Sequence, residues 1–64
     1  MKEYYSVETR IYDTGKIDCK RDGSSRFTEK PDNTCVGLPG YNLYVDWFET
    51  ADEADDFVNE SKTA

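Results

Sequence analysis

Apolar and polar side chains alternate along residues 3–12, and this period of two predicts a half-buried β-strand. The side chains on the more apolar face are those of Tyr5, Val7, Thr9 and Ile11. Residues 13–15, Asp-Thr-Gly, predict a three-residue hairpin loop in which Gly15 takes the left-handed conformation. Such a loop pairs Tyr12 with Lys16, and the loop therefore fixes the register of a second strand.

The register that follows from this loop places side chains of like character on each face of the hairpin. It predicts four cross-strand pairs: Ile11 with Ile17, Thr9 with Cys19, Arg10 with Asp18, and Glu8 with Lys20. Apolar residues then share one face and opposite charges meet on the other, as cross-strand pairing favours. A slip by one residue would turn a whole strand to the wrong face.

The segment 22–40 lacks a clean period and is rich in Gly, Pro, Ser, Asn and Asp, which indicates turns and loops. We expect a long irregular connection here, with an exposed turn at 31–33 and with 35–38 packing back onto the core. Because such long loops are uncommon in compact domains, the segment either hides a short strand near 26–28 or forms an ordered binding loop.

Residues 41–49, YNLYVDWFE, predict a third strand because aromatic and β-branched residues dominate. One face carries Leu43, Val45 and Trp47, and the other carries Tyr44 and Phe48 between polar residues. Two interpretations of the second face stay open. The strand lies in the middle of the sheet, or Tyr44 and Phe48 form an exposed aromatic patch for a partner.

The segment after this strand predicts a helix from about residue 51 to 61. Thr50 and Glu53 have the spacing of a capping box, in which each side chain caps a backbone N–H of the other. Apolar side chains recur at helical spacing, and Phe57 and Val58 are the expected anchors onto the sheet. The predicted fold is therefore α+β: a small, three-stranded, mainly antiparallel sheet with one C-terminal helix packed on one face.

Composition limits the function. The 64 residues suit a single domain, 1–64, with one small core. The chain has no His and no phosphate-binding glycine loop, and its two cysteines are too far apart for a zinc knuckle. We therefore expect no enzyme activity, no cofactor and no metal site.

The same sequence indicates where the chain resides. It shows neither a signal-peptide pattern nor a run of ~20 apolar residues, so we expect a cytoplasmic protein that does not enter membranes. In that compartment Cys19 and Cys35 are expected to be free thiols. A disulfide between them is the alternative.

Charge is unevenly distributed. The net charge is −6, and residues 31–64 carry eight carboxylates against Lys62 alone. Within the predicted helix, Asp52, Asp56 and Glu60 follow one another at intervals of four and form a row. Such a row is either a solvated helix face or a surface for a basic partner. The candidate partner-binding residues are Asp46, Glu49, Asp52, Asp55, Asp56 and Glu60, together with Tyr44 and Phe48.

In type, the chain resembles the very small acidic proteins that phages and other mobile elements encode, including anti-CRISPR proteins. The resemblance lies in the opening MKEYYSVETRIYDTGKIDC, in the acidic end FETADEADDF and in the lack of catalytic residues. It implies an inhibitor that blocks a basic nucleic-acid-binding surface of a host defence effector. The alternative is an interaction or homodimerisation module that uses an aromatic sheet face or a strand edge. Direct nucleic-acid binding by the hairpin is disfavoured because the rest of the chain would repel phosphate.

Overall fold

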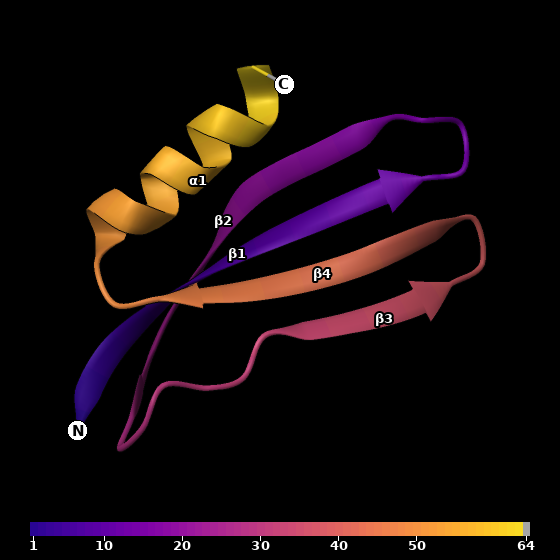
Figure 1. Cartoon of the computed structure of the whole chain (residues 1–64). Helices are drawn as coiled ribbons and strands as arrows, with labels where there is room; N and C mark the ends of the chain where they lie inside the picture. Colours follow the sequence, from indigo (N-terminus) through magenta and orange to yellow (C-terminus); the bar gives the residue numbers. More distant parts are fainter. Residues whose placement is uncertain (64) are drawn as a thin grey trace.

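The structure, a computed structural model, describes residues 1–63. Four strands and one helix occupy this range: β1 (Lys2–Tyr12), β2 (Ile17–Phe27), β3 (Thr34–Leu38), β4 (Tyr41–Phe48) and α1 (Ala51–Thr63). The strands form one antiparallel sheet in the order β2-β1-β4-β3, and α1 lies on one face of it (Figure 1). The α+β class is confirmed. The predicted three-stranded sheet is wrong, because the sheet has four strands.

The N-terminal hairpin has the predicted register. Ile11 pairs with Ile17, Thr9 with Cys19, Arg10 with Asp18, and Glu8 with Lys20. The Tyr12 N–H donates to the Lys16 carbonyl at 2.9 Å, which closes the predicted three-residue loop. Gly15 has φ 91°, the left-handed conformation that a residue with a Cβ adopts at a cost.

On this hairpin, Arg10 forms its ion pair with a residue of the same strand. Arg10 Nη2 lies 2.6 Å from Glu8 Oε1, two residues away on β1. The Arg10 guanidinium also lies 5.8 Å from the centre of the Tyr41 ring on β4. Arg10 therefore ties β1 to the strand on its other side.

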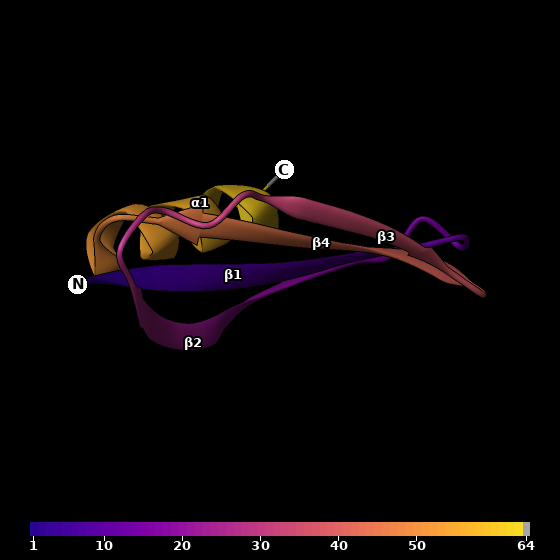
Figure 2. The same ribbon diagram turned by 90° about the horizontal axis from the view of Figure 1, so that it is seen from below.

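The expectation of a long irregular connection over 22–40 is wrong at both ends. β2 continues to Phe27, well beyond the Gly-Ser-Ser stretch that suggested a loop. Ser6 pairs with Gly23 while Val7 pairs with Arg21, so Asp22 is an extra residue at a β-bulge. A bulge bends and twists a strand, and the edge-on view shows β2 bending away from the rest of the sheet (Figure 2).

The other part of that segment forms β3, which pairs with β4 through a two-residue turn. Leu38 pairs with Tyr41 across Pro39-Gly40, and Gly40 has φ 88°. Proline followed by a left-handed glycine is the pattern of a type II turn. Ahead of β3, the Asn33 side chain accepts a hydrogen bond from the Trp47 N–H at 2.8 Å. This bond fixes the 28–33 connection against β4.

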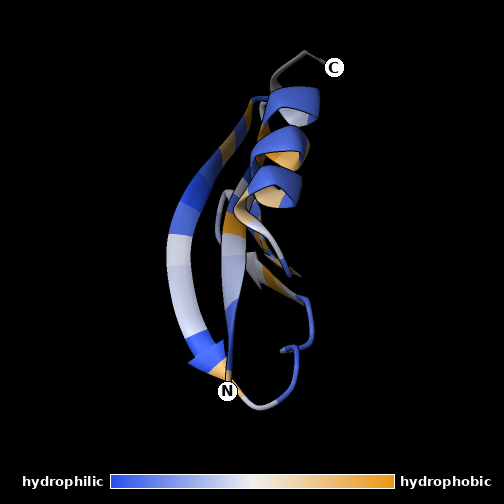
Figure 3. Ribbon diagram, turned by 90° about the vertical axis from the view of Figure 1, so that its left-hand side faces the viewer, coloured by the Kyte–Doolittle hydropathy of each residue, from blue (hydrophilic) through white to orange (hydrophobic). Residues whose placement is uncertain are grey.

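The helix begins where the capping pattern predicts. The Thr50 hydroxyl accepts a hydrogen bond from the Glu53 N–H at 3.2 Å, which satisfies one free donor of the first turn. The main core lies between helix and sheet and consists of Val7, Cys19, Ala54 and Val58, with Tyr5, Phe48 and Phe57 packed around it. Figure 3 shows the helix mostly in hydrophilic colours, since few of its residues meet the sheet.

The β1–β4 register decides which face of β4 the helix covers. Val7 is fully buried in the helix-side core and pairs with Asp46. Side chains alternate along a strand, so Tyr44 and Phe48 also face the helix. Leu43, Val45 and Trp47 therefore lie on the opposite face. A second, aromatic cluster forms at one end of that opposite face. The centroid of the Phe27 ring lies 6.4 Å from that of the Tyr4 ring and 5.4 Å from that of the Trp47 ring.

Candidate functional site

The outward side of α1 is acidic. Ala54 and Val58 face the sheet and are buried, so the helical period directs the charged residues between them to solvent. The exposed carboxylates of the helix are those of Asp52, Glu53, Asp55, Asp56 and Glu60. Asp52 and Glu53 lie in the first turn, where they also complement the helix dipole.

Asp55 differs from its neighbours because it has a basic partner. Its Oδ1 lies 2.7 Å from Arg21 Nη1 on β2, and the Arg21 guanidinium lies 5.3 Å from the centre of the Tyr5 ring. Arg21 thus joins helix and sheet by one ion pair and one cation–π contact. The sequence suggested no partner for Arg21, because the two residues are 34 positions apart.

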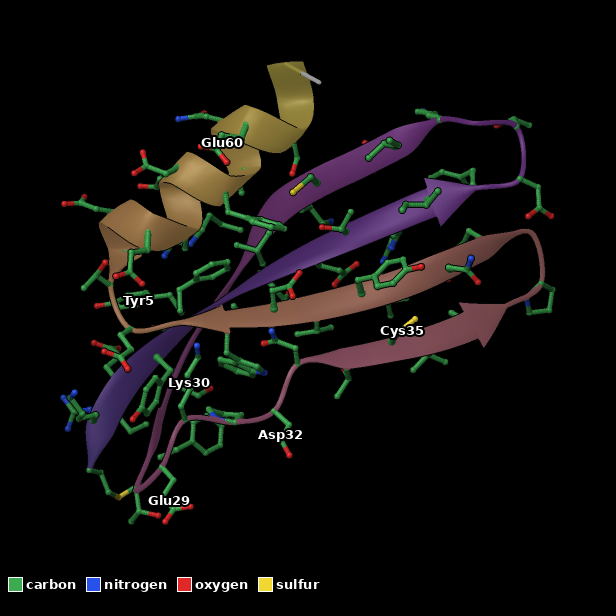
Figure 4. The ribbon with its side chains drawn as sticks, in the orientation of Figure 1. Tyr5, Glu29, Lys30, Asp32, Cys35 and Glu60 are labelled. Atoms are coloured by element: carbon green, nitrogen blue, oxygen red, sulfur yellow. The ribbon has the colours of Figure 1, made fainter. Side chains whose placement is uncertain are left out.

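The predicted row of Asp52, Asp56 and Glu60 lies on the exposed side of the helix. Residues four apart on a helix are neighbours, with about 5–6 Å between Cβ atoms. Figure 4 labels Glu60 at the far end of the row. Glu49 is exposed as well, in the short connection between β4 and α1. These four carboxylates form what we call the acidic helix surface.

Asp46 lies apart from the acidic helix surface, beneath the helix. It is half-buried on β4 and lines an open depression of about 210 Å³ together with Thr9, Ile11, Tyr44 and Phe57. Burial raises the pKa of the Asp46 carboxyl above its usual value. Among residues 1–61, no side chain or backbone group forms a hydrogen bond or ion pair with the Asp46 carboxyl.

Tyr44 and Phe48, for which an exposed aromatic patch was one of two open interpretations, are half-buried on the helix side of the sheet. The centroids of the Phe48 ring and of the Phe57 ring on the helix are 5.2 Å apart. Tyr44 pairs across the strands with Cys35 of β3, and Figure 4 labels Cys35 on that strand. A hydrogen bond to Cys35, the charge of its thiolate and partial burial raise the pKa of the Tyr44 hydroxyl. The interpretation that β4 is a central strand is confirmed, and the exposed patch is not formed by these two residues.

The face of the sheet away from the helix carries an apolar surface that the sequence analysis did not identify as a candidate site. The β3–β4 register places Val36 beside Leu43 and Thr34 beside Val45 on this face, with Leu38 beside Tyr41. Val36 and Leu38 are exposed, at 47% and 37% of their full surface. We call Val36, Leu38, Leu43 and Val45 the aliphatic patch. In sequence, β3 was hidden because it is short and contains Gly37.

The neighbouring part of the same face is charged. A depression of about 270 Å³ lies over four residues of β1 and β2: Glu8, Arg10, Asp18 and Lys20. Two carry a positive and two a negative charge, so this area has no net charge.

The thiols and carboxylates offer little chemistry beyond binding. Cys19 is buried and accepts a hydrogen bond from the Thr9 hydroxyl at 3.4 Å, and Cys35 is exposed. Both are free thiols, as predicted. In the described part of the chain, no three His, Cys, Asp or Glu residues are grouped so that they could hold a metal ion. Over the same residues, no helix is long and apolar enough to cross a membrane.

Comparison of the chain with protein-family models, with curated proteins and with solved structures found no match.

Proposed function

We propose that this protein is a non-catalytic binding protein that applies the acidic helix surface to a basic surface of a partner protein. The class of partner follows the resemblance noted in the sequence: a host defence effector whose basic groove otherwise holds nucleic acid. The protein then acts in the cytoplasm of the host cell, as a nucleic-acid mimic in the manner of some anti-CRISPR proteins.

One observation supports this proposal above the others. Asp52, Asp56 and Glu60 form a row on a helix that Ala54, Val58 and the Arg21–Asp55 ion pair hold to the sheet. Like charges at this spacing slightly destabilise a helix. A row of fixed negative charges, however, suits a groove that evolved to hold phosphates, and it accelerates association by electrostatic steering.

Neutralising the row tests the proposal. The variant Asp52→Asn, Asp56→Asn, Glu60→Gln is expected to bind a partner captured from host lysate about tenfold more weakly at low salt, since each exposed ion pair contributes little alone. The wild-type protein should lose affinity as salt is raised, and the variant should lose much less. Isothermal titration calorimetry with the purified partner, with and without its nucleic acid, measures both effects.

A control variant with the same change of charge separates a specific surface from overall acidity. Asp22→Asn, Glu29→Gln and Asp32→Asn remove three exposed carboxylates that do not belong to the helix, and Glu29 and Asp32 are labelled in Figure 4. The control should bind as the wild type does. Equal affinity of both triple variants, or partner binding that nucleic acid does not compete, would refute the proposal.

The aliphatic patch favours a second candidate function, self-association through the open face of the sheet. By strand spacing and rise, the whole four-stranded face, of which the aliphatic patch and the charged depression are parts, measures about 19 by 27 Å, or about 500 Å² per copy. Two such faces bury about 1,000 Å², the lower limit for a specific interface. None of the four patch residues is charged, and a face-to-face dimer would place the two acidic helices on opposite outer surfaces. Mutual repulsion would then be screened by salt.

The dimer predicts that Val36→Lys abolishes self-association, because it buries a charge in the interface. Ile17→Lys is the matched control, since Ile17 is 52% exposed but lies near the hairpin end on the helix side. Sedimentation velocity from micromolar to millimolar protein should show a concentration-dependent dimer for wild type and Ile17→Lys only. A wild-type protein that stays monomeric throughout this range would exclude the dimer.

A further inference from the structure

The depression beside Phe57 has the size of a site for one side chain. Its volume is about 210 Å³, below the roughly 300–1,000 Å³ of pockets that hold drug-sized molecules. Thr9, Ile11 and Tyr44 form the floor on β1 and β4, and Phe57 forms the wall on the helix. Its exposed lining is almost entirely apolar, and the Asp46 carboxylate and the hydroxyl groups contribute very little surface to it.

Asp46 is the unexplained member of this lining. It occupies the helix side of a central strand, opposite the fully buried Val7, where an apolar side chain would pack better. Removing a carboxylate from water without a partner destabilises a fold. Among the side chains of residues 1–61, none forms an ion pair or hydrogen bond with the Asp46 carboxylate, so none of them offsets this cost.

The surroundings of the depression favour a positive charge. Glu53 and Glu60 lie four residues before and three residues after Phe57, hence on the same strip of the helix. Their carboxylates are exposed above the Phe57 wall. The rings of Tyr44 and Phe57 also border the site, and aromatic faces attract ammonium and guanidinium groups. Ile11 offers an apolar surface for the alkyl part of such a side chain.

We infer that the depression lined by Asp46, Tyr44 and Phe57 binds one Lys or Arg side chain of a protein partner, with Asp46 as its counter-charge. This inference rests on the proposed function, because it assigns an anchor residue to the same basic partner. The acidic helix surface attracts and orients the partner, and the depression takes up one of its cationic side chains. The attraction of the partner and its anchoring are thus assigned to two different parts of the chain.

The probes that test this are N-acetyl-lysine methylamide and N-acetyl-arginine methylamide, with N-acetyl-norleucine methylamide as the uncharged control. Titration of the ¹⁵N-labelled protein should shift the amide signals of Thr9, Tyr44, Asp46 and Phe57, with millimolar dissociation constants for at least one cationic probe. Asp46→Asn should weaken this binding at least about fivefold, as expected when a carboxylate–cation pair is removed. Asp32→Asn, the same change of charge at an exposed residue outside both the depression and the acidic helix surface, should leave it unchanged.

Three results would overturn the inference: no shifts around the depression up to about 50 mM probe, equal binding of the norleucine probe, or equal binding by Asp46→Asn. The experiment separates this inference from the proposed function. The double variant Asp52→Asn, Asp56→Asn should retain its probe binding, because Asp46, Glu53 and Glu60 are intact. The probes could bind while the variant Asp52→Asn, Asp56→Asn, Glu60→Gln still binds the partner normally. That result would support the cation site in the depression and refute the role of the acidic helix surface.

Discussion

Replacing Phe57 with alanine is expected to lower the free energy of unfolding by about 3 kcal/mol. The Phe57 ring packs 5.2 Å from Phe48 and borders the core formed by Val7, Ala54 and Val58. Loss of a buried Phe costs about 3–5 kcal/mol, and the lower value applies because Phe57 is half-buried. Domains of this length have only about 3–10 kcal/mol of stability. Urea denaturation followed by far-UV circular dichroism measures the loss.

The control for this variant is Phe57→Leu, which keeps an apolar side chain on the helix. It should lose less than half as much stability as Phe57→Ala, because most of the contact with Phe48 is retained. A Phe57→Ala protein within about 1 kcal/mol of wild type would contradict the prediction. The helix would then be held mainly by Ala54, Val58 and the ion pair between Arg21 and Asp55.

The hairpin could be predicted in detail because its determinants are local. The loop at 13–15 fixes the pairing of Tyr12 with Lys16, and every further pair up to the bulge follows from it. The helix start was equally local, since Thr50 caps a backbone group only three residues away. Interactions of this range leave a pattern within a few neighbouring positions, so the sequence alone was sufficient.

β3 and the second half of β2 could not be predicted in the same way. Gly23 and its two serine neighbours have weak strand propensity, and β3 contains Gly37 and is exposed throughout. These segments become strands because β1 and β4 offer them unpaired edges. Tertiary context overrides propensity in such cases.

In the candidate site, too, only the features that depend on local spacing could be predicted from the sequence. The exposure of Asp52, Asp56 and Glu60 followed from helical spacing alone. The environment of Asp46 and Tyr44 depends on the register between β1 and β4, strands that no short turn connects. Without that register, the sequence could not decide which face of β4 meets the helix. The depression and the open aliphatic patch were therefore both hidden.

Replacing Asp46 with valine is expected to stabilise the fold and to remove the anchor site at once. Valine suits a central strand, and it would pack beside Val7 and Phe57 without desolvating a charge. We expect a gain of about 1 kcal/mol, a modest value because water still screens a half-buried carboxylate. For a chain of this length, that corresponds to a rise in Tm of about 4–8 °C. Thermal denaturation at neutral pH measures the gain.

The pH dependence identifies the Asp46 charge as the cause. Burial raises the pKa of this carboxyl in the folded protein, so the folded state binds its proton more tightly than the unfolded chain does. The destabilisation by the charge is therefore complete above the folded pKa and absent below the unfolded pKa of about 3.9. Asp46→Asn should be more stable than wild type at pH 7, and this advantage should shrink as the pH falls through that window. Glu49→Gln, which removes an exposed charge, should show no such advantage.

If Asp46→Asn and Asp46→Val were both less stable than wild type at pH 7, the carboxylate would be making a stabilising contact. A stabilised protein that no longer binds cationic probes would instead mean that Asp46 is retained for binding, at the expense of stability.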